Sequence, residues 1–333
     1  MLRLLAISAF TIGVVAVVPW IGSRSWAAPQ PALTVDNSRG EPIQPISRST
    51  ELDANKVALG RRLFHDPRLS RDNTVSCASC HDLARGGADG RALAVGIGGL
   101  RGPRNSPTVF NSSLNFRQFW DGRAATLEEQ IEGPIHAQRE MASDWKEILD
   151  KLGRSPEDRA RFQAIYPDGL QSKNVKDAIA TFERSLTTPD SRFDQFLRGN
   201  HHALTPNEQR GYRLFKNYGC ASCHQGVAVG GNLYQTFGVV SAYLEAQTAA
   251  RKPNLRPGAN PKAEGRDQLF KVPGLRNVAL TAPYFHDGSA GSLDQAVRLM
   301  ARHQLGRKLE TREVSQIVAF LRTLTGRYQD HSL

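Results

Sequence analysis

Two segments far apart in the chain share one pattern of apolar positions. Residues 179–187 and 317–325 each carry apolar side chains at their first, fourth and eighth positions, and each ends in Arg, then Ser or Thr, then Leu-Thr. Intervals of three and four residues place these side chains on one face of a helix. We therefore predict an amphipathic helix at each position. The chain contains no alternating pattern long enough to predict a strand of useful length.

These two segments belong to a longer internal repeat. Gly60 and Gly211 each begin a Gly-x-Arg-Leu-Phe segment. Further along, each half has a Pro followed four residues later by an Asn. Nine residues after that Asn comes a Trp or His that is followed by Asp-Gly. A Leu then lies seven residues after the Trp or His in both halves. A repeat of this extent indicates two similar folding units. The matched pairs are Pro107 and Pro273, Asn111 and Asn277, Trp120 and His286, and Leu127 and Leu293.

The repeat sets the expected domain boundaries. We predict a mainly α chain with one helical domain at residues 50–190 and a second at 204–327. Thr205 followed by Pro206 is typical of the start of a helix, because Thr caps the first turn and Pro fits its first position. A length of 333 residues suits two domains of ordinary size. Residues 226–274, rich in Gly, Lys, Arg and Pro, predict a long loop.

The N-terminus predicts export. An apolar run from Leu2 to Trp20 contains a single charged residue, Arg3, and small residues follow it before position 29. The small residues are Ser25, Ala27 and Ala28. This combination is typical of a signal peptide, so we exclude residues 1–28 from the fold and expect the mature protein in the periplasm. The alternative is an uncleaved anchor helix, because the run approaches the roughly 18 residues that span a bilayer.

Composition narrows the class of protein. With 40% hydrophobic and 23% charged residues, the chain resembles soluble globular proteins, and a polytopic membrane protein is excluded. The formal net charge is +11, and loss of Arg3 and Arg24 with the leader leaves +9. A basic balance suits an acidic protein partner, an anionic membrane surface or nucleic acid. Export makes nucleic acid a poor candidate, so none is expected.

The four cysteines predict two covalently bound haem groups. A Cys-x-x-Cys-His motif attaches haem c through two thioether bonds and provides its His as an iron ligand. A four-thiolate zinc site or a pair of redox dithiols also uses four cysteines, but neither explains a His after each pair. We therefore predict two cytochrome-c-like domains, each with one haem. The motif residues are Cys77, Cys80 and His81 in the first half, and Cys220, Cys223 and His224 in the second.

The two halves differ where the sixth iron ligand is expected. Met300 lies fourteen residues after His286, within a segment of plausible helical spacing. A thioether is a soft ligand that favours ferrous iron, although a methionine is often simply a core residue, and His303 is a rival ligand. Pro134 occupies the matching position of the first half and offers no ligand. We expect a six-coordinate second haem and an open first haem.

An open first haem has polar neighbours suited to peroxide. Glu140 follows the matching segment and Gln130 precedes it. A carboxylate beside the iron can take a proton from hydrogen peroxide and return it to the leaving oxygen, while an amide holds the peroxide. The alternative is that Glu140 is a solvated helix charge and Gln130 a surface amide.

At this point the chain resembles the bacterial di-haem cytochrome c peroxidases over nearly its whole mature length. The resemblance implies that Glu140 is the acid-base residue, Gln130 its neighbour, Trp120 the aromatic residue between the haems and Met300 the second distal ligand. His286 is expected among the residues that bind the second haem. The motifs that carry the resemblance are 64–70, 105–108, 119–123, 140–141, 226–231 and 284–288.

The same resemblance implies a calcium ion between the domains. The matching positions are Asn105, Thr281 and Pro283, whose oxygen atoms suit a hard cation. It also implies electron delivery by a small cytochrome c or copper protein, and the basic balance predicts an acidic docking patch on that donor. A homodimer is a candidate assembly.

One position departs from the family pattern. Many family members hold the first haem inactive with a labile His about sixteen residues after the motif His, and Ile97 occupies that region here. No His occurs between Asp82 and Ile135, so we expect this lock to be absent. His136 and Met141 remain candidate substitutes through loop movement.

The function predicted from these observations is reduction of hydrogen peroxide to water by a periplasmic di-haem peroxidase. One alternative resembles the di-haem enzymes that oxidise tryptophans of a partner protein. Those enzymes use a Tyr where this chain has Met300, which argues against that alternative. A second alternative is a two-haem electron carrier without catalysis, which requires both irons to be six-coordinate.

Overall fold

The computed structural model describes residues 40–48, 51–241, 269–329 and 331–333. The predicted leader at 1–28 lies outside these residues. No helix in the described part of the chain is long and apolar enough to span a bilayer. The elements in chain order are α1 (Ala54–Phe64), α2 (Cys77–Cys80), α3 (Leu127–His136), α4 (Trp145–Gly153), α5 (Pro156–Ile165), α6 (Ser172–Ser185), α7 (Arg192–Leu197), α8 (Pro206–Asn217), β1 (Tyr234–Thr236), β2 (Leu269–Lys271), α10 (Leu293–Leu305), α11 (Thr311–Arg322), β3 (Arg327–Tyr328) and β4 (His331–Ser332).

The mainly α prediction is confirmed, and the two predicted amphipathic helices are α6 and α11. Strands within the described ranges are two or three residues long and form two antiparallel pairs, β1 with β2 and β3 with β4. Helix α8 begins as the sequence predicts: Thr205 accepts a hydrogen bond from the Glu208 N–H, and Pro206 occupies the first helical position. The short helix α7 lies between the two predicted domains and was not anticipated.

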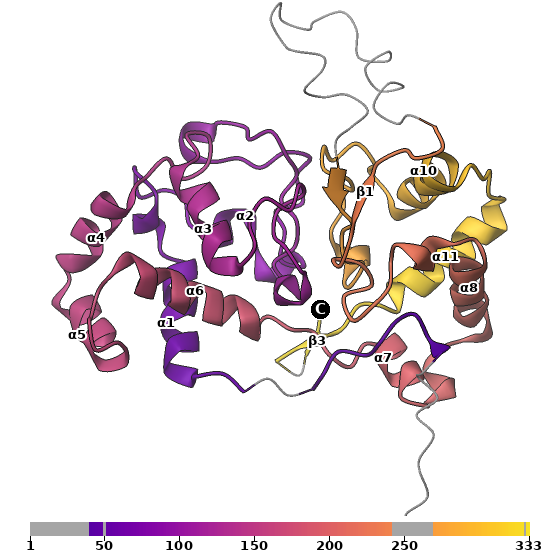
Figure 1. The fold of residues 1–333 in the computed structure, drawn as a ribbon, viewed down its shortest axis with the longest axis horizontal. Helices are drawn as coiled ribbons and strands as arrows, with labels where there is room; N and C mark the ends of the chain where they lie inside the picture. Colours follow the sequence, from indigo (N-terminus) through magenta and orange to yellow (C-terminus); the bar gives the residue numbers. More distant parts are fainter. Residues whose placement is uncertain (1–39, 49–50, 242–268, 330) are drawn as a thin grey trace, which may run out of the picture. The chain divides into compact units, whose positions relative to one another are not determined.

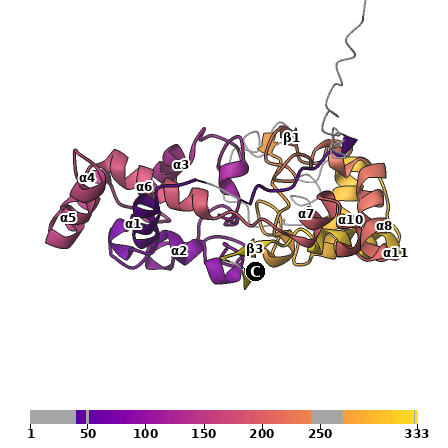
Figure 2. The same cartoon turned by 90° about the horizontal axis from the view of Figure 1, so that it is seen from below.

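Each half is built on one close helix crossing. Helix α1 packs against α6, and α8 packs against α11 (Figure 1), and both pairs lie side by side again in Figure 2. A Cβ atom added to Gly60 would lie 1.9 Å from the carbonyl oxygen of Ala178. At the matching crossing, a Cβ atom added to Gly211 would lie 1.9 Å from the carbonyl oxygen of Gln316. The glycine that opens each Gly-x-Arg-Leu-Phe segment is therefore required because two helix backbones touch there.

The apolar side chains form two separate cores. One contains Phe64 and Phe182 among residues of the first half, and the other is built around Phe320. Ile43 and Phe193, both fully buried, belong to the second core although they lie outside residues 204–327. Segments on both sides of the first domain thus pack onto the second, and the boundaries predicted from the repeat leave them out.

Matched asparagines join the ends of the two repeats. Asn111 and Asn277 both have positive φ angles, of 62° and 60°, and their N–H groups donate to Leu186 and Leu324. Their side-chain amides both donate to the hydroxyl of Thr188, at 2.8 and 3.1 Å. All three polar side chains are buried, so this network supplies hydrogen bonds that water does not provide there.

Helices α3 and α10, which contain Pro134 and Met300, begin in the same way. Thr126 caps α3 by accepting from the Glu129 N–H, and Ser292 caps α10 by accepting from the Gln295 N–H. Leu127 and Leu293 are thus the first residues of α3 and α10. The register places Pro134 inside α3 at the position that Met300 holds in α10.

Candidate functional site

In the first Cys-x-x-Cys-His motif, the short helix α2 presents both thiols. Ser76 and Ser79 form a capping box at its start, and the His81 N–H donates to the Cys77 carbonyl. The His81 ring meets the carbonyl oxygen of Gly87 through Nδ1, at 3.4 Å. Burial lowers the pKa of His81, which favours the neutral ring. An N–H at Nδ1 leaves Nε2 as the ligating atom.

The second motif repeats this arrangement. The His224 N–H donates to the Cys220 carbonyl, and Nδ1 of the ring meets the carbonyl oxygen of Val229 at 3.3 Å. Burial lowers the pKa of His224 to about 4, so this ring is neutral near pH 7. Sequence reasoning missed both carbonyl partners. The available signal was a glycine pair a few residues after each motif, Gly86-Gly87 and Gly230-Gly231.

Three of the four attachment cysteines lie in surroundings that keep their thiols neutral. Burial raises the pKa of Cys77 to about 12 and that of Cys80 and Cys220 to about 11. No cluster of three or more His, Cys, Asp or Glu side chains that could hold a metal ion occurs within the described ranges. Buried, neutral thiols of this kind suit covalent attachment to an apolar cofactor edge.

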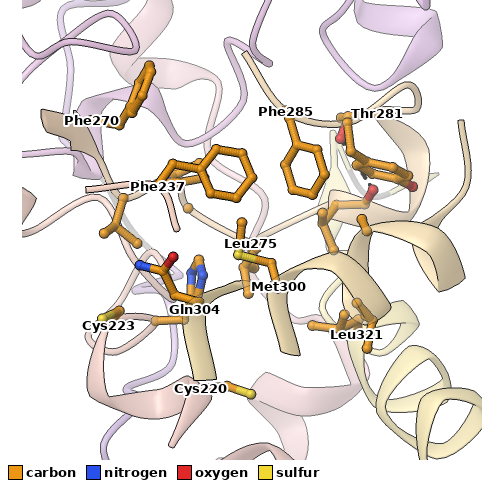
Figure 3. A pocket seen from close by; sticks show the side chains of 18 of the residues that line it. Cys220, Cys223, Phe237, Phe270, Leu275, Thr281, Phe285, Met300, Gln304 and Leu321 are labelled. Carbon is orange, nitrogen blue, oxygen red and sulfur yellow. Dashed lines mark hydrogen bonds between the residues drawn. The ribbon is translucent and has the colours of Figure 1, made fainter. Parts of the chain in front are cut away.

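Beside the second motif lies a cavity of about 270 Å³. Cys220, Cys223, His224 and Met300 all line it, and Figure 3 shows the cysteine and Met300 side chains around the cavity. His303, the rival ligand, does not line it. Its ring is buried elsewhere and bonds through Nδ1 to Ser241. The geometry therefore favours Met300 over His303 as the sixth ligand.

On the distal side of the first motif, Glu140 lies against the loop that contains Ile97. The Ile97 N–H donates to the Glu140 carbonyl at 2.8 Å, and the Cys80 thiol lies 3.8 Å from the carbonyl oxygen of Val95 in the same loop. Burial raises the pKa of the Glu140 carboxyl, and the charge of Arg123 opposes that shift to a smaller extent. Glu140 is thus a partly desolvated acid near the attachment cysteines rather than a solvated helix charge.

The other candidates around the first haem site have different surroundings. Gln130 is half-buried on α3, and its side chain makes no hydrogen bond to any described residue. His136 bonds through Nδ1 to the Ser143 carbonyl and through Nε2 to Glu132, at 3.2 and 3.1 Å. Met141 is 3% exposed and belongs to the first core. His136 thus already has partners at both ring nitrogens, and Met141 packs within the first core.

Trp120 and His286, the matched residues of the two Asp-Gly triplets, meet where the repeats come together. Their ring centroids are 6.4 Å apart at an angle of 71°. The Trp120 indole N–H donates to the Asn105 carbonyl, and the Asn105 N–H donates to the His286 carbonyl, both at 2.9 Å. Burial lowers the pKa of His286 to about 4. An aromatic and hydrogen-bonded connection thus links the two halves.

The three predicted calcium ligands all line the cavity beside the second Cys-x-x-Cys-His motif. The Asn105 amide donates to the Arg91 carbonyl at 2.7 Å, which directs its nitrogen there and leaves its side-chain oxygen as the atom for a cation. The Thr281 hydroxyl donates to the Val278 carbonyl. Pro283 follows Thr281 by two residues. These contacts leave calcium binding as a prediction.

Together, the two motifs, the neutral histidines with backbone partners and the cavity beside Met300 fit two haem c groups on a cytochrome c-like fold. This defines the class of protein as a two-haem c-type cytochrome. Residues 54–202 match the family model described as di-haem cytochrome c peroxidase, and residues 208–325 match the cytochrome c model.

Relatives agree over most of the chain. It is 50% identical over 297 residues to the cytochrome c peroxidase Ccp of Escherichia coli, covering 89% of this chain and 63% of that protein. It is 48% identical to the cytochrome c551 peroxidase of Nitrosomonas europaea, covering 88% and 86%. The crystal structure of a MauG-like protein associated with microbial copper homeostasis is similar with a TM-score of 0.68 and 27% identity, covering 90% and 95%. The chain belongs to the di-haem cytochrome c peroxidase family.

Proposed function

We propose that this chain reduces hydrogen peroxide to two water molecules, consuming two electrons and two protons, in the periplasm. The observation that carries the proposal is the difference between the repeats: Met300 lines the cavity of the second haem site, whereas Pro134 stands at the matching position of α3. Met300 would provide the second haem with a soft sixth ligand, and Pro134 would provide none to the first. Names of relatives that are 48–50% identical support the same activity.

Each haem, when bound, supplies an iron that changes charge by one electron, and the open site also supplies a coordination position for peroxide. Glu140 would take a proton from one oxygen of peroxide and return it to the leaving oxygen. Burial raises its pKa, which suits a group that both accepts and donates a proton. The Gln130 amide holds peroxide in the orientation that this transfer needs.

The second half receives and passes on electrons. The thioether of Met300 would hold the iron of the second haem and favour its ferrous state, so this site would accept electrons from a small cytochrome c or copper protein. Trp120 contacts the His286 ring, so it would provide an aromatic path for electrons between the two halves. The Met300 thioether also argues against the tryptophan-oxidising alternative.

The proposal also includes a calcium ion, an export signal, an acidic electron donor and a homodimer. A calcium ion binds between the halves through oxygen atoms of Asn105, Thr281 and Pro283. Residues 1–28 direct export and are removed. The mature protein docks an acidic donor through its basic surface, with a homodimer as the candidate assembly.

The experiment is a steady-state peroxide assay with several reduced small cytochromes and copper proteins, preceded by mass spectrometry that should find two covalent haems. Changing both Cys77 and Cys80 to Ala should abolish turnover while a His/Met low-spin spectrum remains, because Met300 belongs to the other half. Turnover that survives loss of the first haem would overturn the assignment of the catalytic site.

A further inference from the structure

The cavity of the second haem site contains an unusual distribution of charge. Its lining includes no Asp or Glu among the described residues, and its cationic members are Arg276 and Lys271. Arg276 is paired, because its guanidinium lies 2.7 Å from Asp194, and both side chains are at most 2% exposed. Asp194 therefore neutralises the charge of Arg276 inside the protein.

Lys271 is buried without such a partner. It ends β2 and is 8% exposed, and its side chain makes no hydrogen bond or ion pair with any residue that the structure describes. Burial lowers the pKa of its amine to about 8, with no nearby carboxylate opposing the shift. Burying an unpaired charge is costly, so a lysine kept in such a place indicates an anion that arrives from elsewhere.

The cofactor that the two motifs attach brings suitable anions. Each haem carries two propionate carboxylates, and most of the cavity wall is apolar, including Phe237, Phe270 and Phe285. A charge-assisted hydrogen bond from an ammonium to a carboxylate is among the stronger polar contacts in a protein interior. We propose that Lys271 binds a propionate of the second haem. The proposal rests on the haem assignment and is independent of peroxide as the substrate.

A positive charge at this place has two consequences for the site. It stabilises the reduced haem, whose charge is one unit more negative than that of the oxidised haem, and so adds to the effect of Met300 on the potential. The Lys271 backbone N–H also donates to the Trp120 carbonyl at 2.8 Å, which ties the propionate-binding residue to the aromatic contact between the halves. The register of the repeat places Asn105 at the matching position of the first half, so this position carries no cation there.

The test uses the full two-haem protein and measures the midpoint potential of each haem separately by redox titration. Lys271→Met removes the charge but keeps the length of the side chain. Lys271→Arg keeps the charge, and Lys308→Met removes an exposed charge of the same half as a control. A retained His/Met low-spin spectrum shows that the second site is intact. If the Met variant loses that spectrum, Lys271→Asn, which copies Asn105, replaces it in the titration.

We expect Lys271→Met to lower the potential of the second haem, with roughly a tenfold change in its ferric-to-ferrous ratio at the wild-type midpoint, about 59 mV for one electron. Lys271→Arg should retain most of the wild-type potential of the second haem, and Lys308→Met should leave that potential unchanged. Equal potentials in Lys271→Met and Lys308→Met would overturn the proposal. A shift confined to the first haem would overturn it as well, because the lysine would then bind the other cofactor.

Discussion

The backbone N–H of Ile97 donates a hydrogen bond of 2.8 Å to the carbonyl oxygen of Glu140. The residue before Ile97 is packed even more tightly, since a Cβ atom added to Gly96 would lie 2.4 Å from the Glu140 Cα. The loop that contains Gly96 and Ile97 provides no side chain that could bind iron, but its backbone packs against Glu140, the proposed acid-base residue. Ile97 itself packs against the first core.

This close packing makes Gly96 sensitive to a single methyl group. Gly96 has a φ of −102°, which alanine adopts freely, so Gly96→Ala adds only the steric conflict with the backbone of Arg139 and Glu140. We expect turnover to fall by about tenfold or more with unchanged haem content, because small displacements of a catalytic group are costly. Gly40→Ala, where nothing lies within 4 Å, is the control for peroxide assays. Equal rates in the two variants would show that Glu140 does not depend on this contact.

Replacing the proposed acid-base group should affect chemistry rather than folding. Glu140→Gln keeps the side-chain shape but removes proton transfer, so turnover should fall by roughly 10²-fold or more. Glu129→Gln changes an exposed carboxylate on α3 and should retain wild-type turnover. Steady-state peroxide kinetics compare the two. An unchanged rate in Glu140→Gln would return this residue to a structural role.

The pH profile tests the same residue independently. Glu140 must be ionised to accept the first proton, and burial raises its pKa above the ordinary value of 4.5. The rate at limiting peroxide should therefore decrease as pH falls through this raised pKa, so the acidic limb lies above pH 4.5. The limb should be absent from the residual activity of Glu140→Gln. A limb at the same pH in that variant would assign it to another group.

The choice between Met300 and His303 is open to spectroscopy. Met300→His should keep a low-spin second haem but lower its potential, because imidazole does not share the preference of a thioether for ferrous iron. His303→Ala should leave the potential unchanged, since the His303 ring bonds to Ser241 outside the cavity lining. The opposite result, with a shift only in His303→Ala, would make His303 the ligand.

Much of the fold follows from local signals in the sequence. Helix α11 and the start of α8 at Thr205 could be predicted because periodicity and capping act over a few residues. Gly60 and Gly211 were visible as repeated positions, but their role depends on a helix more than a hundred residues away. Sequence reasoning therefore found that these glycines matter without finding the helix crossing.

The functional site also combines features that local sequence predicts with features that depend on tertiary packing. The attachment cysteines and their histidines are adjacent in sequence, so their chemistry could be predicted directly. The contact between Trp120 and His286, and the hydrogen bond from Ile97 to Glu140, join residues brought together only by tertiary packing. His136 was a candidate lock in the sequence because nothing local shows that Glu132 and Ser143 occupy both of its ring nitrogens.

The central claim is that peroxide reaches an open first haem in the resting protein, since Ile97 offers no ligand and both ring nitrogens of His136 are engaged. The most direct measurement mixes fully oxidised protein with peroxide and follows the Soret band by stopped flow, in wild type, Ile97→His and His136→Ala. We predict an immediate reaction in wild type and His136→Ala, and a reaction in Ile97→His only after the second haem is reduced. Wild-type protein that stays inert until reduced, while His136→Ala reacts at once, would contradict the account.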